Sequence, residues 1–121
     1  KLHKKFTIGD IDITPIEVMH GSLPISGYRL NDTAYITDMK TIADGELEYL
    51  KGVKTMVVNA LRYQEHPTHQ TVEDAIAFIR RVGSKRNYLI HMSHHIGLHA
   101  EQNKLLPQGI KLGYDGMVIK V

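Results

Sequence analysis

The strongest indications of the fold lie in residues 55–83, TMVVNALRYQEHPTHQTVEDAIAFIRRVG. Its first part, residues 55–61, is an apolar run, which predicts a β-strand covered on both faces. In residues 71–82 apolar side chains recur at i, i+3, i+4 and i+7, Thr71 can cap, Asp74 follows three residues later, and Gly83 ends the pattern. This spacing predicts an amphipathic helix with a capping box. A buried strand followed by such a helix indicates a layered α/β fold.

Upstream, residues 6–19 alternate between apolar and polar side chains around a Gly-Asp turn, which predicts a β-hairpin ending near His20. We expect a loop at residues 21–27, then two strands at 27–30 and 33–37 joined by Asn31 and Asp32. These two polar residues tolerate positive φ and suit a two-residue turn. Apolar residues at helical spacing predict a further helix at residues 42–50, and Gly52 is a plausible stop after it.

Downstream, residues 87–91 predict another buried strand, and residues 100–106 a short helix that Pro107 stops. Two closing strands are expected at 111–113 and 117–121. The whole chain, residues 1–121, is therefore interpreted as one domain of the α/β (α+β) class, with a mixed sheet and helices on one face.

Composition excludes several classes of protein. The chain has 121 residues and a formal net charge of +2, from 15 Lys and Arg against 13 Asp and Glu. It has no Cys, which excludes disulfide frameworks, Cys-based zinc fingers, iron–sulfur clusters and thiol nucleophiles. No apolar run is long enough to span a membrane, and no signal peptide is recognisable, so we expect a cytoplasmic protein without a membrane partner. The near-balanced charge gives no electrostatic reason to expect a nucleic-acid partner.

Histidine is the unusual feature, with 8 residues in the chain. Three potential metal ligands, His20, Asp38 and His91, each follow the end of a predicted strand. Strand ends at one sheet edge are common ligand-binding places, and imidazole and carboxylate groups suit Zn²⁺, Mn²⁺ or Fe²⁺. The alternative is that each side chain only forms a hydrogen bond at a strand terminus. The residues alone leave both interpretations open.

Two further groups of histidines follow. His69 closes the segment HPTH just before the predicted helix at 71–82, where an imidazole could donate to a phosphate or oxyanion. Its alternative is a solvated loop side chain, which we favour for His66. In HMSHHIGLH, residues 91–99, His94 is the best candidate to support a ligand or contact substrate. His95 and His99 suit a surface loop.

The order of these landmarks resembles that of a known family. The segments are SLPISGY (22–28) after His20, YITD (35–38), HPTH (66–69), LIHMSH (89–94) and LPQGIKLGYDGMVI (106–119). Together they resemble the C-terminal half of metallo-β-lactamase-fold hydrolases, in the branch of the cyclic-phosphate phosphodiesterase of phosphonate metabolism and, more distantly, ribonuclease Z. The resemblance implies an αββα sandwich and a small phosphodiester substrate.

The same resemblance implies roles for individual residues. His20 and His91 match metal ligands, Asp38 matches the carboxylate that bridges two metals, and His69 matches the histidine that contacts the scissile phosphate or assists the leaving group. His66 and His94 would support the ligands or contact substrate. In the whole enzyme two Zn or Mn ions would generate a hydroxide that hydrolyses the phosphodiester.

One departure from the family is large. Its His-x-His-x-Asp-His signature, which provides most ligands of both metals, does not occur in these 121 residues. We therefore expect a C-terminal half-domain that binds one metal or none, is inactive alone, and exposes an apolar sheet face for a missing N-terminal half or a homodimer partner. The alternatives are a noncatalytic binding or assembly module and a ribonuclease-Z-like nuclease, the latter disfavoured because no basic, aromatic-rich patch is evident.

Overall fold

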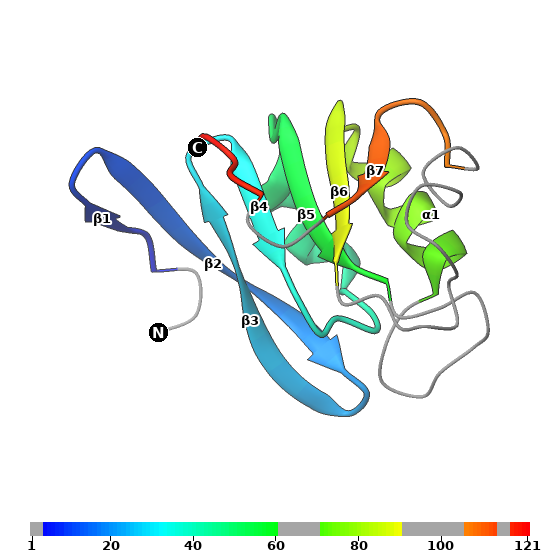
Figure 1. Cartoon of the computed structure of the whole chain (residues 1–121). Helices are drawn as coiled ribbons and strands as arrows, with labels where there is room; N and C mark the ends of the chain where they lie inside the picture. The colour runs from blue at the N-terminus through cyan, green and yellow to red at the C-terminus, as the bar shows by residue number, and fades with distance from the viewer. Residues whose placement is uncertain (1–3, 61–70, 91–105, 114–116) are drawn as a thin grey trace.

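The computed structural model describes residues 4–60, 71–90, 106–113 and 117–121. They form a seven-stranded sheet whose strands lie in the order of the sequence (Figure 1). The first four strands pair antiparallel and the last four pair parallel, so the sheet is mixed as predicted. The strands are β1 (Phe6–Ile8), β2 (Ile11–His20), β3 (Leu23–Leu30), β4 (Thr33–Ile36), β5 (Thr55–Asn59), β6 (Arg86–Ile90) and β7 (Ile110–Leu112).

The predicted amphipathic helix is confirmed as α1 (Val72–Val82). The backbone N–H of Asp74 donates to Thr71 Oγ1 at 3.1 Å, and the N–H of Thr71 donates to Asp74 Oδ2 at 3.3 Å. This is the predicted capping box, and it satisfies two backbone donors at the helix start. Gly83 ends the helix with φ 84°, in the left-handed region that glycine adopts without penalty.

The main core lies between the sheet and the helices on one of its faces (Figure 1). The 3-10 helix η1 (Asp44–Leu50) contributes Leu50, which is 1% exposed. We call the sheet face that packs against these helices the covered face. Its fully buried strand residues, all 0% exposed, are Ile16, Val18, Ala34, Ile36, Met56, Val58 and Leu89, and α1 adds Val72, Ala75, Phe78 and Ile79.

Two upstream predictions are wrong in detail. Residues 21–27 are not a loop. After a tight turn at Gly21 and Ser22, β3 begins at Leu23, and the whole of β3 pairs with β2. The Gly, Ser and Pro content suggested a loop, but pairing with a long neighbouring strand overrides it. The segment predicted as a helix over 42–50 is the 3-10 helix η1, whose Glu46 side chain accepts a hydrogen bond from the N–H of Glu17 on β2.

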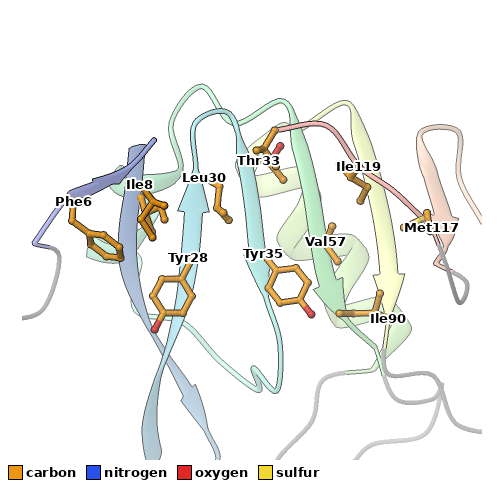
Figure 2. Close-up of a pocket in the computed structure, with 12 residues that line it drawn as sticks. Phe6, Ile8, Tyr28, Leu30, Thr33, Tyr35, Val57, Ile90, Met117 and Ile119 are labelled. Atoms are coloured by element: carbon orange, nitrogen blue, oxygen red, sulfur yellow. The ribbon is translucent and has the colours of Figure 1, made fainter. Parts of the chain in front are cut away.

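At the C-terminus, residues 117–121 are not a strand. They cross the sheet instead of pairing with a neighbour, and Met117 and Ile119 turn toward its surface (Figure 2). The strand expected at 111–113 is confirmed one residue earlier, as β7. Residues 100–105 of the predicted short helix lie outside the described residues. Leu106, its last residue, lies in a bend.

The face opposite the helices, which we call the open face, is also apolar (Figure 2). It bounds a hollow of about 670 Å³, which is lined by residues from β1 to β6 and from the C-terminal segment. Tyr35 is 47% exposed and Ile8 61% exposed, although both are large apolar side chains on strands. Of the described residues, only the C-terminal segment lies across this hollow, so a hydrophobic surface remains open.

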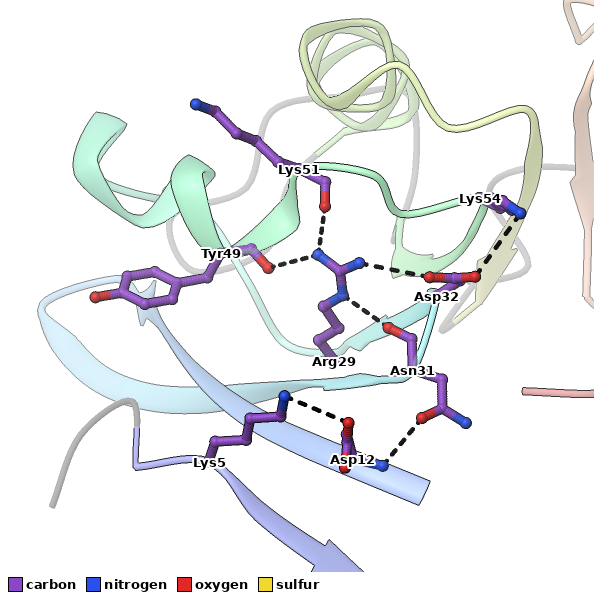
Figure 3. A network of polar contacts seen from close by, with 8 residues as sticks. All are labelled: Lys5, Asp12, Arg29, Asn31, Asp32, Tyr49, Lys51 and Lys54. Carbon is purple, nitrogen blue, oxygen red and sulfur yellow. Dashed lines mark hydrogen bonds and ion pairs between the residues drawn. The ribbon is translucent and has the colours of Figure 1, made fainter. Parts of the chain in front are cut away.

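An arginine ties the loops at one end of the sheet to β3 (Figure 3). The Arg29 side chain donates to three backbone carbonyls, those of Asn31, Tyr49 and Lys51, and lies 3.6 Å from an Asp32 carboxylate oxygen. A guanidinium group has five donors in a rigid fork, which suits it to such a multiple anchor. The network fixes the end of η1 against the turn between β3 and β4.

Among the described residues, no helix has the length and apolar character required to cross a membrane.

Candidate metal centre

His20 and Asp38 come together at the end of the sheet where β2 and β4 finish. His20 is the last residue of β2, and Asp38 follows β4 after one intervening residue. An isolated bridge between Met19 and Thr41 draws the segment after β4 alongside the end of β2. Both candidate ligands are partly buried, so each can be held by the fold and still face the edge of the sheet.

The contact between the two residues fixes the histidine. His20 Nδ1 lies 2.8 Å from the backbone carbonyl oxygen of Asp38. Because a carbonyl can only accept, Nδ1 must carry the proton in this hydrogen bond. A metal would therefore bind His20 through Nε2, the arrangement that metal-ligating histidines commonly show.

Asp38 itself has an unusual backbone conformation. Its φ is 59°, in the left-handed region, where among non-glycine residues Asp and Asn are over-represented. The residues after it are anchored to β2, since Lys40 N–H donates to Met19 O at 2.7 Å and Met19 N–H donates to Thr41 O at 2.9 Å. The direction of the Asp38 carboxylate is thus determined by the fold as well as by its own rotamer.

The other predicted site residues fall outside the described part of the chain. They are His66 and His69, in residues 61–70, and His91 and His94, in residues 91–105. β6 ends at Ile90, whose carbonyl accepts from Ala60 N–H at 2.8 Å, so the described chain reaches the same edge immediately before His91. Within the described residues, no group of three or more His, Asp or Glu side chains is arranged so that it could hold a metal ion. The roles of these four histidines remain predictions.

The two described candidates have suitable chemistry for a divalent metal. An imidazole oriented through its other nitrogen and a carboxylate on an anchored loop are the donors that Zn²⁺ and Mn²⁺ accept. They provide two donors, fewer than a structural or catalytic site requires, so any complete centre needs further ligands.

Comparisons with known proteins show the family of the chain. A family model described as "Beta-lactamase superfamily domain" matches residues 1–92. The chain belongs to this superfamily. A crystal structure of a new diphosphatase from the PhnP family matches with a TM-score of 0.92 and 34% identity, over 100% of this chain and 47% of that one. The superfamily fold generally binds divalent metal ions.

Two further matches are more distant or cover a smaller part of the relative. The metallo-beta-lactamase fold protein YhfI from Bacillus subtilis matches with a TM-score of 0.73 at 14% identity, over 97% of this chain and 52% of that one, and shows the fold alone. An octanoyltransferase from Porphyromonas gingivalis is 47% identical over 113 residues, which are 93% of this chain but 23% of that protein. The chain thus spans less than a quarter of this relative and about half of the two structural matches.

Sequence reasoning missed one residue at this edge. Asn59, the last residue of β5, is 0% exposed, and its side chain is hydrogen-bonded to the backbone of Met39, next to Asp38. A polar side chain within the apolar run TMVVNAL was the available signal, because a buried amide requires partners. The identity of those partners depends on the loop after β4, which residue spacing alone does not give.

Proposed function

We propose that this chain is the part of a metal-dependent hydrolase that contributes His20, Asp38 and His91 to a divalent metal centre, with phosphodiesters as substrates. The observation that carries the proposal is the His20–Asp38 contact at the sheet edge, within a chain that is 34% identical to a PhnP-family diphosphatase. The octanoyltransferase name describes a protein of which the chain matches 23%, so we infer no transferase activity from it.

In this proposal each residue has a separate task. Asp38 O orients the His20 ring, so that Nε2 and the Asp38 carboxylate act as ligands. When bound, Zn²⁺ or Mn²⁺ would supply the Lewis acidity that activates water and offsets charge on the phosphate. His69 would hold a proton near the leaving group, and His66 and His94 would support the ligands or bind substrate.

The test is metal titration of the 121-residue chain with Mn²⁺ or Zn²⁺, followed by metal analysis. We expect at most one equivalent, lost in His20→Ala and in His91→Ala and retained in His99→Ala, which removes an imidazole predicted to lie on the surface. Binding that survives both ligand substitutions would contradict the assignment. In a longer protein that also carries His-x-His-x-Asp-His, His91→Ala should abolish hydrolysis of small phosphodiesters.

A second part of the proposal concerns what covers the open face. The two structural matches are about twice as long, since this chain covers 47% of one and 52% of the other, so their remaining half is one candidate. In the 121-residue chain alone we expect a second copy to cover this face, because exposed apolar patches of this kind favour association. The cytoplasm is the proposed location, and the lack of Cys suits its reducing conditions.

A further inference from the structure

Asn59 forms a pair of hydrogen bonds with a single residue of the loop after β4. Met39 N–H donates to Asn59 Oδ1 at 2.9 Å, and Asn59 Nδ2 donates to Met39 O at 2.9 Å. The side-chain amide therefore pairs with a backbone unit much as a neighbouring strand would. Both bonds are buried, where water cannot replace them.

Met39 follows Asp38 directly, so the two hydrogen bonds act on the residue that bears the candidate carboxylate. β4 ends at Ile36, beside Val58 in the parallel register, and Asn59 is one step further along β5. The amide thus meets the chain just after it leaves the sheet, where Asp38 has a φ of 59°. A left-handed non-glycine residue persists only where its surroundings hold it.

The loop after β4 also contacts the end of β2, where it orients His20. The Asp38 carbonyl accepts from His20 Nδ1, and Lys40 N–H donates to Met19 O, next to His20. A rotation of the Met39 backbone would move the Asp38 carbonyl and carboxylate together. Asn59 is therefore hydrogen-bonded to the backbone segment that also contacts His20 and carries the Asp38 carboxylate.

We propose that Asn59 is a positioning residue, which fixes the Asp38 backbone and thereby sets the His20 tautomer and the direction of the Asp38 carboxylate. The metal-binding purpose of this arrangement rests on the proposed function, but the effect of Asn59 on His20 does not. The positioning role therefore has its own readout in the metal-free chain.

The experiment is nitrogen NMR of the His20 side chain in the metal-free 121-residue chain under mildly alkaline conditions. In the unmodified chain we expect the proton on Nδ1, whereas an unconstrained neutral imidazole carries it mainly on Nε2. In Asn59→Ala the Nδ1 signature should be lost, and affinity for Mn²⁺ or Zn²⁺ should fall roughly 10–100-fold, as for other residues that orient metal ligands.

Asn87 provides a matched control at the opposite end of the sheet. It is 3% exposed, and its side chain donates to the carbonyls of Ser84 and Gly109. Asn87→Ala and Asn59→Ala should lower Tm by similar amounts, about 5 °C each, because each removes a buried hydrogen-bonding group. It should leave the His20 signature and the metal affinity unchanged.

A second variant keeps the test decisive if Asn59→Ala does not fold. Asn59→Asp has nearly the same size but replaces the donor to Met39 O with an acceptor, and it should also lose the Nδ1 signature. Retention of that signature in the Asn59 variants, or its loss in Asn87→Ala, would overturn the positioning role. A tautomer set by Asn59 in a chain whose metal binding survives both His20→Ala and His91→Ala would instead refute the proposed function alone.

Discussion

The two faces of the sheet are both apolar, yet within the described residues helices cover only one of them. On β4 the neighbours Ala34 and Ile36 point to the covered face and are 0% exposed, whereas Tyr35 between them is 47% exposed on the open face. On β5 both sets of side chains are buried, including Val57, which lines the open hollow. A sheet with two apolar faces is built to lie between two layers. The covered face therefore accounts for the stability of the chain, and the open face is the surface that we propose another layer covers.

The largest expected effect comes from the covered face of β6. Leu89 is fully buried against the helices, so Leu89→Ala should lower the free energy of unfolding by about 2–5 kcal/mol through lost burial and a new cavity. The matched control is Ile90→Ala, on the same strand but facing the open hollow and only partly buried. Denaturant unfolding should show less than half the loss for Ile90. Equal losses would mean that both faces are packed equally tightly.

A smaller effect is expected where the covered face leaves no space for a side chain. A Cβ added at Gly27 on β3 would lie 2.9 Å from Ile36 Cγ1, closer than real Cβ contacts allow. Gly27→Ala should therefore cost about 1–3 kcal/mol, because the surrounding side chains must shift. Gly45, in η1, has nothing within 4 Å of its added Cβ, so Gly45→Ala should be neutral or slightly stabilising in the same unfolding measurement. A neutral Gly27→Ala would contradict tight packing on this face.

The sequence was sufficient for elements whose local signals agree with their tertiary contacts. The capping box of α1, the hairpin of β1 and β2, and the turn at Asn31 all follow from short-range chemistry, and each is confirmed. The start of β3 was missed because its Gly, Ser and Pro residues indicate a loop, whereas pairing with β2 decides the outcome. Local propensity fails where a long-range partner supplies the stabilising contacts.

For the candidate site, the position of strand ends was predictable and the detailed geometry was not. Apolar runs that stop at His20 and near Asp38 indicated that both lie at a sheet edge, and the structure brings them into contact. That contact uses the Asp38 backbone carbonyl, and it depends on a left-handed φ and on Asn59 from β5. Residue spacing contains no information on such backbone orientations, because they arise from tertiary hydrogen bonds.

The smallest effect on stability, and the clearest on association, should come from the open face. A double variant, Ile8→Thr with Tyr35→Thr, removes two exposed apolar side chains that line the hollow. We expect a change within about 0.5 kcal/mol in the free energy of unfolding, measured under dilute conditions where the chain is monomeric, because neither side chain belongs to the covered core.

Light scattering at tens of micromolar should nevertheless show weaker self-association for the double variant than for the unmodified chain. The matched control is Val118→Thr: Val118 is 88% exposed but does not line the hollow, so its substitution should leave association unchanged. A monodisperse monomer for the unmodified chain would contradict the proposal that a second copy covers this face. A fall in association in the Val118 variant as large as in the double variant would show that general surface hydrophobicity, and not the open face, drives the contact.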